Sequence, residues 1–133
     1  MSFGFAPEII VEIGTKEGGN SLLFLKTLKK INTYIGIDVM VRNYGKLKYL
    51  VKNDSKIFSI HSNSRFPEVI YIIKKLLKGR SIDFLFVDGD HSYEGVKADF
   101  ESYGPLVKDG GLIAFHDIVL DKKSNDGNWA GDV

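Results

Sequence analysis

Residues 82–118 read IDFLFVDGDHSYEGVKADFESYGPLVKDGGLIAFHDI, and this stretch shows the strand–helix–strand pattern that decides the fold. Residues 82–87 form the most apolar run of the chain, which is typical of a strand buried on both faces. Four residues at steps of three and four then predict a helix with one apolar face: Tyr93, Val96, Phe100 and Tyr103. Another apolar run, at residues 112–115, predicts the next strand.

The same alternation extends toward the N-terminus. Apolar runs predict strands at residues 9–13, 33–39 and 56–60, and apolar periodicity predicts helices at residues 20–30 and 41–51 and from Pro67 to a stop at Gly79. Pro105, Gly110 and Gly111 predict a turn before the strand at residues 112–115. Strands that alternate with helices predict an α/β fold, in which a doubly wound, mostly parallel sheet lies between two helical layers.

The composition fits one globular domain over residues 1–133 and excludes several classes of protein. The 18 basic and 17 acidic residues give a net charge of +1, so we expect neither a nucleic acid nor a membrane surface as partner. The chain has no cysteine, which excludes a disulfide scaffold, a thiolate zinc site and a cysteine nucleophile. Its apolar runs are too short to span a bilayer and it begins without a signal peptide, so we expect a cytoplasmic protein.

A glycine-rich turn follows the first predicted strand. Residues 11–21 read VEIGTKEGGNS, and the glycines allow a tight turn and a close approach of the backbone to a ligand. The spacing differs from the G-x-G-x-x-G of nicotinamide-binding proteins, and no Gly-Lys-Ser/Thr follows as in a phosphate loop. Glu12 stands inside the apolar strand, where a carboxylate needs a partner. A cationic or hydroxyl-bearing ligand, or buried backbone donors, would satisfy it.

Polar residues also follow the other predicted strands, whose carboxyl ends should meet at one edge of the sheet. Asp38 ends the second strand, where this fold class binds a ribose diol, and small polar residues occupy positions 61–64. Residues 88–91 contain two carboxylates and an imidazole, and His116 and Asp117 follow the last strand. If the last two strands are neighbours, Asp88, His116 and Asp117 could hold a divalent cation.

Each of these positions has a purely structural alternative. The glycines could form a simple strand–helix turn, and Asp38 could be an exposed turn residue. Asp90 or Ser92 could cap the following helix, and His116 could be a core histidine bonded to backbone. These alternatives leave unexplained why polar clusters follow five consecutive strands.

Taken together, these residues resemble a known family. Residues 82–118 are similar to the central segment of class I S-adenosylmethionine-dependent methyltransferases, in particular a small-molecule O-methyltransferase-like group with DGDHSYEGV and GGxxxxHD segments. Residues 11–21 resemble that family's first motif, E-x-G-x-x-x-G, and YIGIDV at residues 34–39 resembles its second. The resemblance covers residues 8–118 and implies a Rossmann-like sheet with strand order 3-2-1-4-5.

The resemblance also implies how S-adenosylmethionine would be bound. The glycine turn would lie against its methionine part, with Glu12 near the ammonium, and Asp38 would bind the ribose hydroxyls. Asn63 and Ser64 would lie by the adenine, and Asp88 would lie near the reacting centre. The full set that we expect to contact the cofactor is Glu12, Gly14, Thr15, Gly18, Asn20, Ser21, Asp38, Val39, Asn63, Ser64 and Asp88.

The same resemblance implies methyl transfer to a hydroxyl of a small molecule, with His91 and Asp88 as catalytic residues. His91 would act as the general base, because an imidazole can take the proton of the acceptor hydroxyl near neutral pH. In metal-dependent relatives, residues at the places of Asp88, His116 and Asp117 hold magnesium, which implies Mg²⁺ or another divalent cation here. His116 replaces an acid that some of those relatives carry at this place.

The chain departs from the family in length, because the family sheet usually has seven strands and the sequence predicts five. We therefore expect an incomplete domain in which the strand at residues 112–115 forms a bare edge, through which two copies could associate. Two other functions stay open. Asp88-Gly89-Asp90 is also typical of metal-dependent glycosyltransferases that bind nucleotide sugars, and the chain could be a non-catalytic cofactor-binding remnant.

Overall fold

The computed structural model describes residues 4–40, 44–51 and 54–116. Over these residues the chain forms a parallel five-stranded sheet in the order β3-β2-β1-β4-β5. The strands are β1 (Ile9–Ile13), β2 (Thr33–Asp38), β3 (Lys56–His61), β4 (Ile82–Val87) and β5 (Val107–Phe115). The predicted α/β fold and strand order are confirmed.

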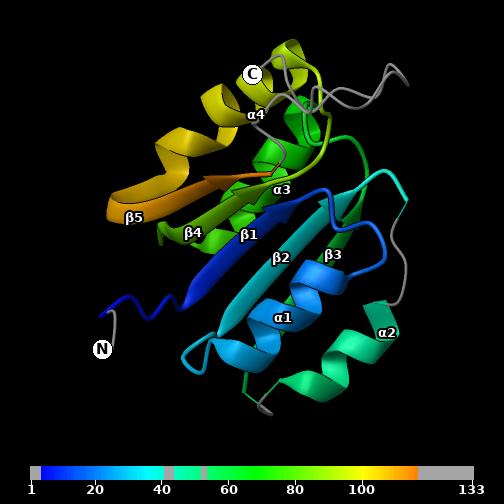
Figure 1. The fold of residues 1–133 in the computed structure, drawn as a ribbon. Helices are drawn as coiled ribbons and strands as arrows, with labels where there is room; N and C mark the ends of the chain where they lie inside the picture. The colour runs from blue at the N-terminus through cyan, green and yellow to red at the C-terminus, as the bar shows by residue number, and fades with distance from the viewer. Residues whose placement is uncertain (1–3, 41–43, 52–53, 117–133) are drawn as a thin grey trace, which may run out of the picture.

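Helices cover both faces of the sheet (Figure 1). One layer contains α1 (Gly19–Thr27), α2 (Tyr44–Leu47) and the 3₁₀ turn η1 (Lys48–Leu50), and the other contains α3 (Pro67–Leu77), α4 (Tyr93–Tyr103) and the 3₁₀ turn η2 (Gly104–Leu106). None of the helices in the described residues is both long and apolar enough to cross a membrane.

The central strand β1 is buried at every residue, and its side chains alternate between two cores. Val11 packs in a core with Ile73 of α3, whereas Ile10 packs in the opposite core with Leu25 of α1. Because side chains alternate along a strand, Glu12 lies on the same face as Ile10, toward α1. This placement decides what Glu12 contacts.

Three predicted segments differ from the structure by more than two residues. Strand β5 begins at Val107, five positions before the expected start, and Gly110 and Gly111 lie inside it rather than in a turn before it. The pairing of β4 with β5 is irregular here, since Ile82 pairs with Val107 and Phe84 with Leu112, so the extra residues bulge out of the ladder.

The other two concern the helices. The predicted helix at residues 41–51 is reduced to the single turn of α2 and the turn η1 within its described part. Helix α1 ends at Thr27 rather than at residue 30. Its N-cap is Gly18, which has no side chain to accept a hydrogen bond, and the Ser21 side chain is buried.

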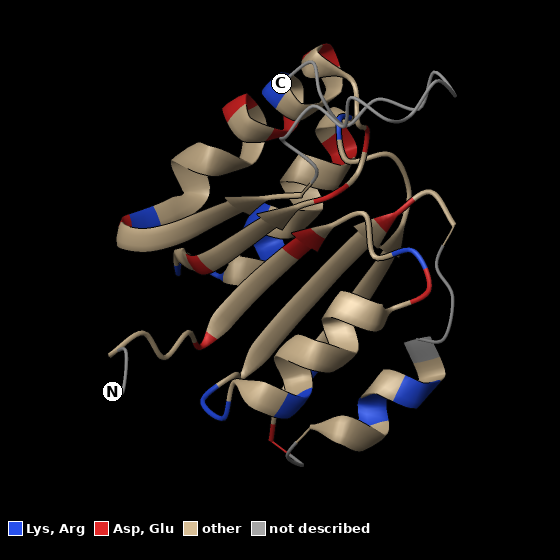
Figure 2. Ribbon diagram, in the orientation of Figure 1, with Lys and Arg blue, Asp and Glu red and all other residues tan. Residues whose placement is uncertain are grey.

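Backbone hydrogen bonds bring the loops after the strands to one edge of the sheet. Each loop amide meets a carbonyl at the end of a neighbouring strand: Gly14 N with Ile37 O, Asp88 N with Ile13 O, His116 N with Val87 O and Ser62 N with Asp38 O, at 2.7–3.0 Å. Figure 2 shows acidic positions at this edge and a basic position on the loop between β1 and α1. The polar clusters that the sequence placed after separate strands therefore converge.

Candidate functional site

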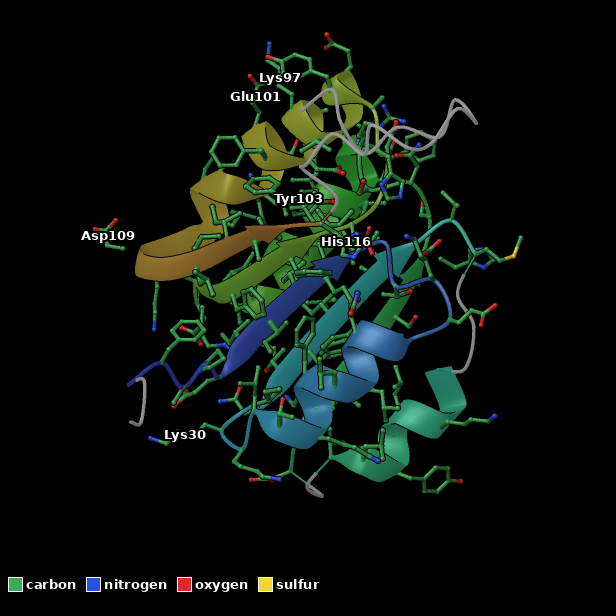
Figure 3. The ribbon with its side chains drawn as sticks, viewed as in Figure 1. Lys30, Lys97, Glu101, Tyr103, Asp109 and His116 are labelled. Carbon is green, nitrogen blue, oxygen red and sulfur yellow. The ribbon has the colours of Figure 1, made fainter. Side chains whose placement is uncertain are left out.

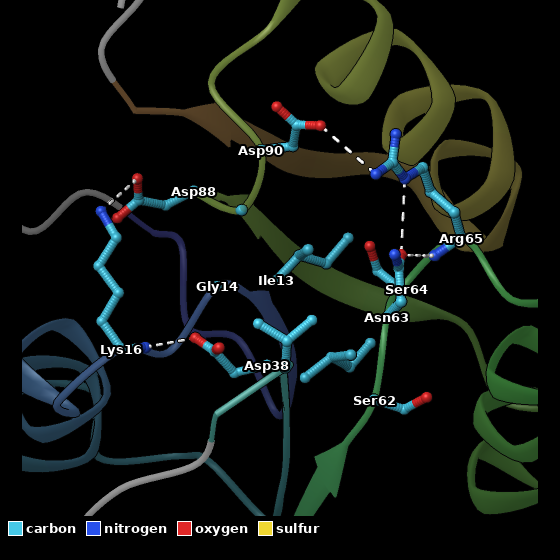
Figure 4. A pocket seen from close by; sticks show the side chains of 13 residues that line it. Ile13, Gly14, Lys16, Asp38, Ser62, Asn63, Ser64, Arg65, Asp88 and Asp90 are labelled. Carbon is cyan, nitrogen blue, oxygen red and sulfur yellow. Dashed lines mark hydrogen bonds and ion pairs between the residues drawn. The ribbon is translucent and has the colours of Figure 1, made fainter. Parts of the chain in front are cut away.

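A pocket of about 270 Å³ opens at the carboxyl edge of the sheet (Figure 4). It is lined by Ile13, Gly14, Lys16, Ile37, Asp38, Val39, Ser62, Asn63, Ser64, Arg65, Asp88, Gly89 and Asp90. Six residues predicted to contact a cofactor are among them: Gly14, Asp38, Val39, Asn63, Ser64 and Asp88. Ligands of doubly wound folds bind at this place, beyond the carboxyl ends of the strands.

The glycine turn forms one wall of the pocket and touches the end of β4. Gly14 has a φ of +84°, and a Cβ there would collide with the carbonyl group of Asp88. A residue with a side chain would therefore push β1 and β4 apart at the pocket. Lys16 also adopts a positive φ, of 48°, which is uncommon for a residue other than glycine.

Asp38 stands at the end of β2 and is fixed by two backbone amides. Its Oδ2 accepts a hydrogen bond from Lys16 N at 2.7 Å, and its Oδ1 accepts one from Met40 N at 2.9 Å. A carboxylate oxygen can accept more than one hydrogen bond, so both oxygens keep acceptor capacity toward the pocket.

The loop after β3 is tied to the loop before α4 across the pocket. Asn63 Oδ1 accepts a hydrogen bond from Arg65 N at 3.0 Å, and the Arg65 guanidinium lies 3.4 Å from Asp90 Oδ2 (Figure 4). The Ser92 amide donates to Asp90 Oδ1 at 2.9 Å, and this bond, helped by Arg65, holds the pKa of Asp90 below its usual value. Ser92 also caps α4 by accepting from Gly95 N, so the capping alternative holds for Ser92.

Hydrogen bonds with two residues of α4, Asp99 and Tyr103, hold the loop after β3 in place. Ser64 Oγ donates to Asp99 Oδ1 at 2.6 Å, and the Tyr103 hydroxyl donates to the Ser64 carbonyl at 2.6 Å. Tyr103 lies between α4 and the sheet in Figure 3. Burial raises the pKa of the Asp99 carboxyl and of the Tyr103 phenol. The Ser64 hydroxyl therefore bonds to Asp99 of α4, although Ser64 lines the pocket.

Asp88 is the centre of a cluster of basic side chains. Its side chain is 3% exposed, and its Oδ1 lies 3.3 Å from Lys16 Nζ, 3.4 Å from His116 Nδ1 and 3.9 Å from His91 Nε2. His116 is exposed at the end of β5 and so is not the core histidine of the alternative (Figure 3). The structure brings together Asp88, His91 and His116, as predicted, while Asp117 lies outside the described residues.

Glu12 lies under the glycine turn and is fully buried. Its Oε2 accepts hydrogen bonds from Ser21 Oγ at 2.6 Å and from the Tyr34 hydroxyl at 2.5 Å, and these two hydroxyls lie 2.7 Å apart. Burial raises the pKa of Glu12 from 4.5 to about 7, against the lowering effect of the two hydroxyls. Among the described residues, Glu12 Oε1 and Thr15 Oγ1 are buried without a hydrogen-bond partner.

The five other residues predicted to contact a cofactor do not line the pocket: Glu12, Thr15, Gly18, Asn20 and Ser21. The hydroxyls of Ser21 and Tyr34, rather than a ligand, satisfy one oxygen of Glu12. The sequence reasoning assigned no role to Lys16 or Arg65, which line opposite sides of the pocket. Their positions in the sequence could have indicated a role in binding, since each follows a predicted strand at the carboxyl edge of the sheet.

Sequence comparisons place the chain among methyltransferases. A family model described as a methyltransferase domain matches residues 11–118. An uncharacterized protein of Acanthamoeba polyphaga mimivirus is 41% identical over 114 residues, which cover 80% of this chain and 50% of that protein. The rhamnosyl O-methyltransferase of Mycobacterium bovis is 23% identical, over 84% of this chain and 46% of that protein. The chain thus spans about half the length of these curated relatives.

Comparison of structures shows the same fold in larger proteins. The MycE methyltransferase of mycinamycin biosynthesis, in complex with Mg and S-adenosylhomocysteine, matches with a TM-score of 0.61 and 23% identity, over 82% of this chain and 27% of that chain. A short chain dehydrogenase family protein of Francisella tularensis matches with a TM-score of 0.55 and 16% identity, over 87% of this chain and 54% of that chain. Because enzymes of two kinds share this fold, the site has to decide the chemistry.

Proposed function

This chain belongs to the methyltransferase domain family whose model it matches, and from that premise we propose that it binds S-adenosylmethionine and transfers the methyl group to a hydroxyl oxygen of a small molecule. The observation that carries the proposal is the pocket beside the glycine turn. Asp38 at the end of β2, Asn63 after β3 and Asp88 after β4 all line it. The O-methyltransferase name of the mycobacterial relative supports oxygen as the accepting atom.

The charged and apolar side chains that line the pocket fit this cofactor. S-adenosylmethionine carries a sulfonium and an ammonium, and the pocket presents three carboxylates, from Asp38, Asp88 and Asp90. The side chains of Ile13 and Ile37 add an apolar floor, against which an adenosine group can pack. When bound, the cofactor supplies an electrophilic methyl group.

Asp38 is the residue that would hold the ribose. Its carboxylate is already oriented by the amides of Lys16 and Met40, so little entropy is lost when it accepts hydrogen bonds from the two ribose hydroxyls. Asn63 and Ser64 would lie toward the adenine, on the far side of the pocket (Figure 4). The β1–α1 turn and Asp88 would then face the methionine end.

His91 is the residue that would take the acceptor proton. The methyl group passes from sulfur to the acceptor oxygen, and the proton of that hydroxyl passes to an imidazole nitrogen of His91. Asp88 Oδ1, 3.9 Å from His91 Nε2, would balance the positive charge that the imidazole gains. Holding the acceptor in line with the methyl group contributes the rest of the acceleration.

The described residues among the predicted metal ligands do not form a site for a divalent cation. Within residues 4–40, 44–51 and 54–116, no group of three histidine or acidic side chains could hold a metal ion, and Asp117 lies outside these residues.

Binding of S-adenosylhomocysteine, measured by calorimetry, tests the proposal. We expect micromolar binding by the wild-type chain and a loss of about 100-fold in Asp38→Ala, because two hydrogen bonds to a charged group are removed. Asp109→Ala is the matched control, since Asp109 is exposed at the opposite end of β5 from His116 (Figure 3). A folded wild-type chain that binds a uridine diphosphate sugar with Mn²⁺, and not S-adenosylhomocysteine, would overturn the proposal in favour of glycosyl transfer.

A further inference from the structure

Lys16 contacts two of the carboxylates that line the pocket, those of Asp38 and Asp88. Its backbone N–H donates to Asp38 Oδ2 at 2.7 Å, and its Nζ lies 3.3 Å from Asp88 Oδ1 (Figure 4). A positive φ is unfavourable for lysine, so the bond to Asp38 helps to hold the backbone in this conformation. That conformation directs the side chain over the pocket toward Asp88.

The Lys16 ammonium provides a positive charge next to the buried Asp88 carboxylate. The Asp88 side chain is 3% exposed, and a carboxylate so deeply buried needs a cation or hydrogen-bond donors close by. Lys16 Nζ also lies 3.5 Å from His91 Nε2, so the same ammonium contacts the carboxylate and the imidazole that the proposed reaction uses.

A divalent cation would compete with Lys16 for the same carboxylate oxygen. Mg²⁺ binds carboxylate oxygens at about 2.1 Å, and an ammonium 3.3 Å from Asp88 Oδ1 would lie close to a cation bound to that oxygen and repel it. His116 Nδ1 and His91 Nε2 lie 3.4 Å and 3.9 Å from that oxygen as well. The two imidazoles thus surround the same oxygen, but among the described residues they do not form with Asp88 a group that could hold a metal ion.

We propose that Lys16 is the resident cation of this site, which neutralises Asp88 and excludes a divalent ion from it. The catalytic consequence rests on the proposed methyl transfer: the Lys16 ammonium would stabilise negative charge on the acceptor oxygen while His91 takes the proton. Lys16 would thereby take the electrostatic role that a metal ion has in metal-dependent methyl transfer. The exclusion of the ion itself requires no cofactor and can be measured alone.

Titration with Mn²⁺, followed by electron paramagnetic resonance in the absence of cofactor, tests the exclusion. The variants are Lys16→Gly, which tolerates the positive φ, Lys16→Arg, which keeps the charge, and the double variant Lys16→Gly/Asp88→Asn. We expect Lys16→Gly to bind Mn²⁺ at least about tenfold more tightly than the wild-type chain, because a neighbouring positive charge is removed. Lys16→Arg and the double variant should bind as weakly as wild type.

Two outcomes would overturn the proposal. If the wild-type chain binds Mn²⁺ as tightly as Lys16→Gly does, Lys16 excludes nothing. If Lys16→Gly also fails to bind Mn²⁺, removal of the lysine has not opened a metal site and the competition does not exist. Calorimetry with S-adenosylhomocysteine on the same samples separates these results from a failure of the proposed function, and circular dichroism confirms that each variant is folded.

Discussion

Two aspartates at the opposite ends of β4 show how one residue type can serve structure at one end and chemistry at the other. Asp83 and Asp88 are both buried, and each lies near a lysine. At the amino end, the amides of Glu8 and Ile9 donate to Asp83 Oδ2 at 2.8 Å, and Lys108 Nζ lies 2.6 Å from Oδ1. Asp83 therefore ties the start of β1 to β4.

At the carboxyl end, the described partners of Asp88 are side chains. They come from Lys16, His91 and His116, at 3.3–3.9 Å, and each of these side chains is at least one-third exposed. Backbone amides are fixed by the sheet, whereas partly exposed side chains can move aside. An acid held by amides can therefore stabilise the fold, whereas partly exposed side chains around an acid can rearrange when a ligand binds.

The largest effect that we expect is on stability, from Asp83→Ala. This change leaves two backbone amides without an acceptor and removes an ion pair, which should lower the free energy of unfolding by about 4 kcal/mol. Urea denaturation at neutral pH measures the loss, with Asp109→Ala as the control, since Asp109 is exposed on β5. A loss no larger than that of the control would show that the two ends of β4 do not differ in this way.

The pH dependence adds to this prediction. Partial burial raises the pKa of Asp83, but hydrogen bonds from Lys108 and from the amides of Ile9 and Glu8 outweigh it, so the pKa is lowered overall. A lowered pKa stabilises the fold above the ordinary carboxyl pKa, and this stabilisation is lost as the pH falls through the folded value. The difference between wild type and Asp83→Ala should therefore shrink in acid.

The pKa of Glu12 is raised, whereas that of Asp83 is lowered, and Glu12 gives the next largest expected effect on stability. Its donors are two neutral hydroxyls, and burial raises its pKa from 4.5 to about 7. Between these values the folded chain holds a proton that the unfolded chain has released, so stability falls as the pH rises through this window, by about 3 kcal/mol in total. Glu12→Gln should abolish that fall.

Denaturation of wild type and Glu12→Gln at about pH 5 and about pH 8 measures the change. The variant should gain stability relative to wild type at the higher pH, whereas Glu94→Gln, at an exposed position on α4, should follow wild type at both. Parallel behaviour of Glu12→Gln and wild type would contradict a raised pKa at Glu12.

The sequence predicts the strands well because buried parallel strands read as uninterrupted apolar runs. The observed bounds of β1 and β4 are the predicted ones, residues 9–13 and 82–87. The start of β5 could not be predicted in this way. Gly110 and Gly111 are read locally as a turn, but their place in the strand depends on the irregular pairing of β5 with β4, which is a tertiary feature.

The same reasoning explains which site residues could be foreseen. Asp38, Asn63 and Asp88 follow strands, and parallel strands bring all such residues to one edge. The partners of Glu12 could not be foreseen, because they depend on which face of β1 meets α1. The contact of Lys16 could not be foreseen either, because a lysine in a loop usually lies in solvent and its approach to Asp88 is a tertiary feature of a turn in which Lys16 has a positive φ.

The smallest effect that we expect is on stability in Asp88→Asn, and this variant tests most directly whether the two ends of β4 differ. The side chains around Asp88 are partly exposed, Lys16 by 54% and His116 by 44%, so solvent screens their interactions with the carboxylate. Asparagine keeps the side-chain volume and one acceptor oxygen, and it removes the cost of burying a charge. The free energy of unfolding should therefore change by less than about 1 kcal/mol.

Asp83→Asn is the matched variant at the other end of β4, and it should cost about 2 kcal/mol, because one amide oxygen cannot replace a carboxylate that accepts from Ile9, Glu8 and Lys108. Urea denaturation of the two variants side by side gives the difference between them. If Asp88→Asn proves as destabilising as Asp83→Asn, then the side chains around Asp88 stabilise the fold as strongly as backbone amides do. Lys16 could then not be readily displaced, and a ligand would have to bind beside the ion pair rather than in exchange for it.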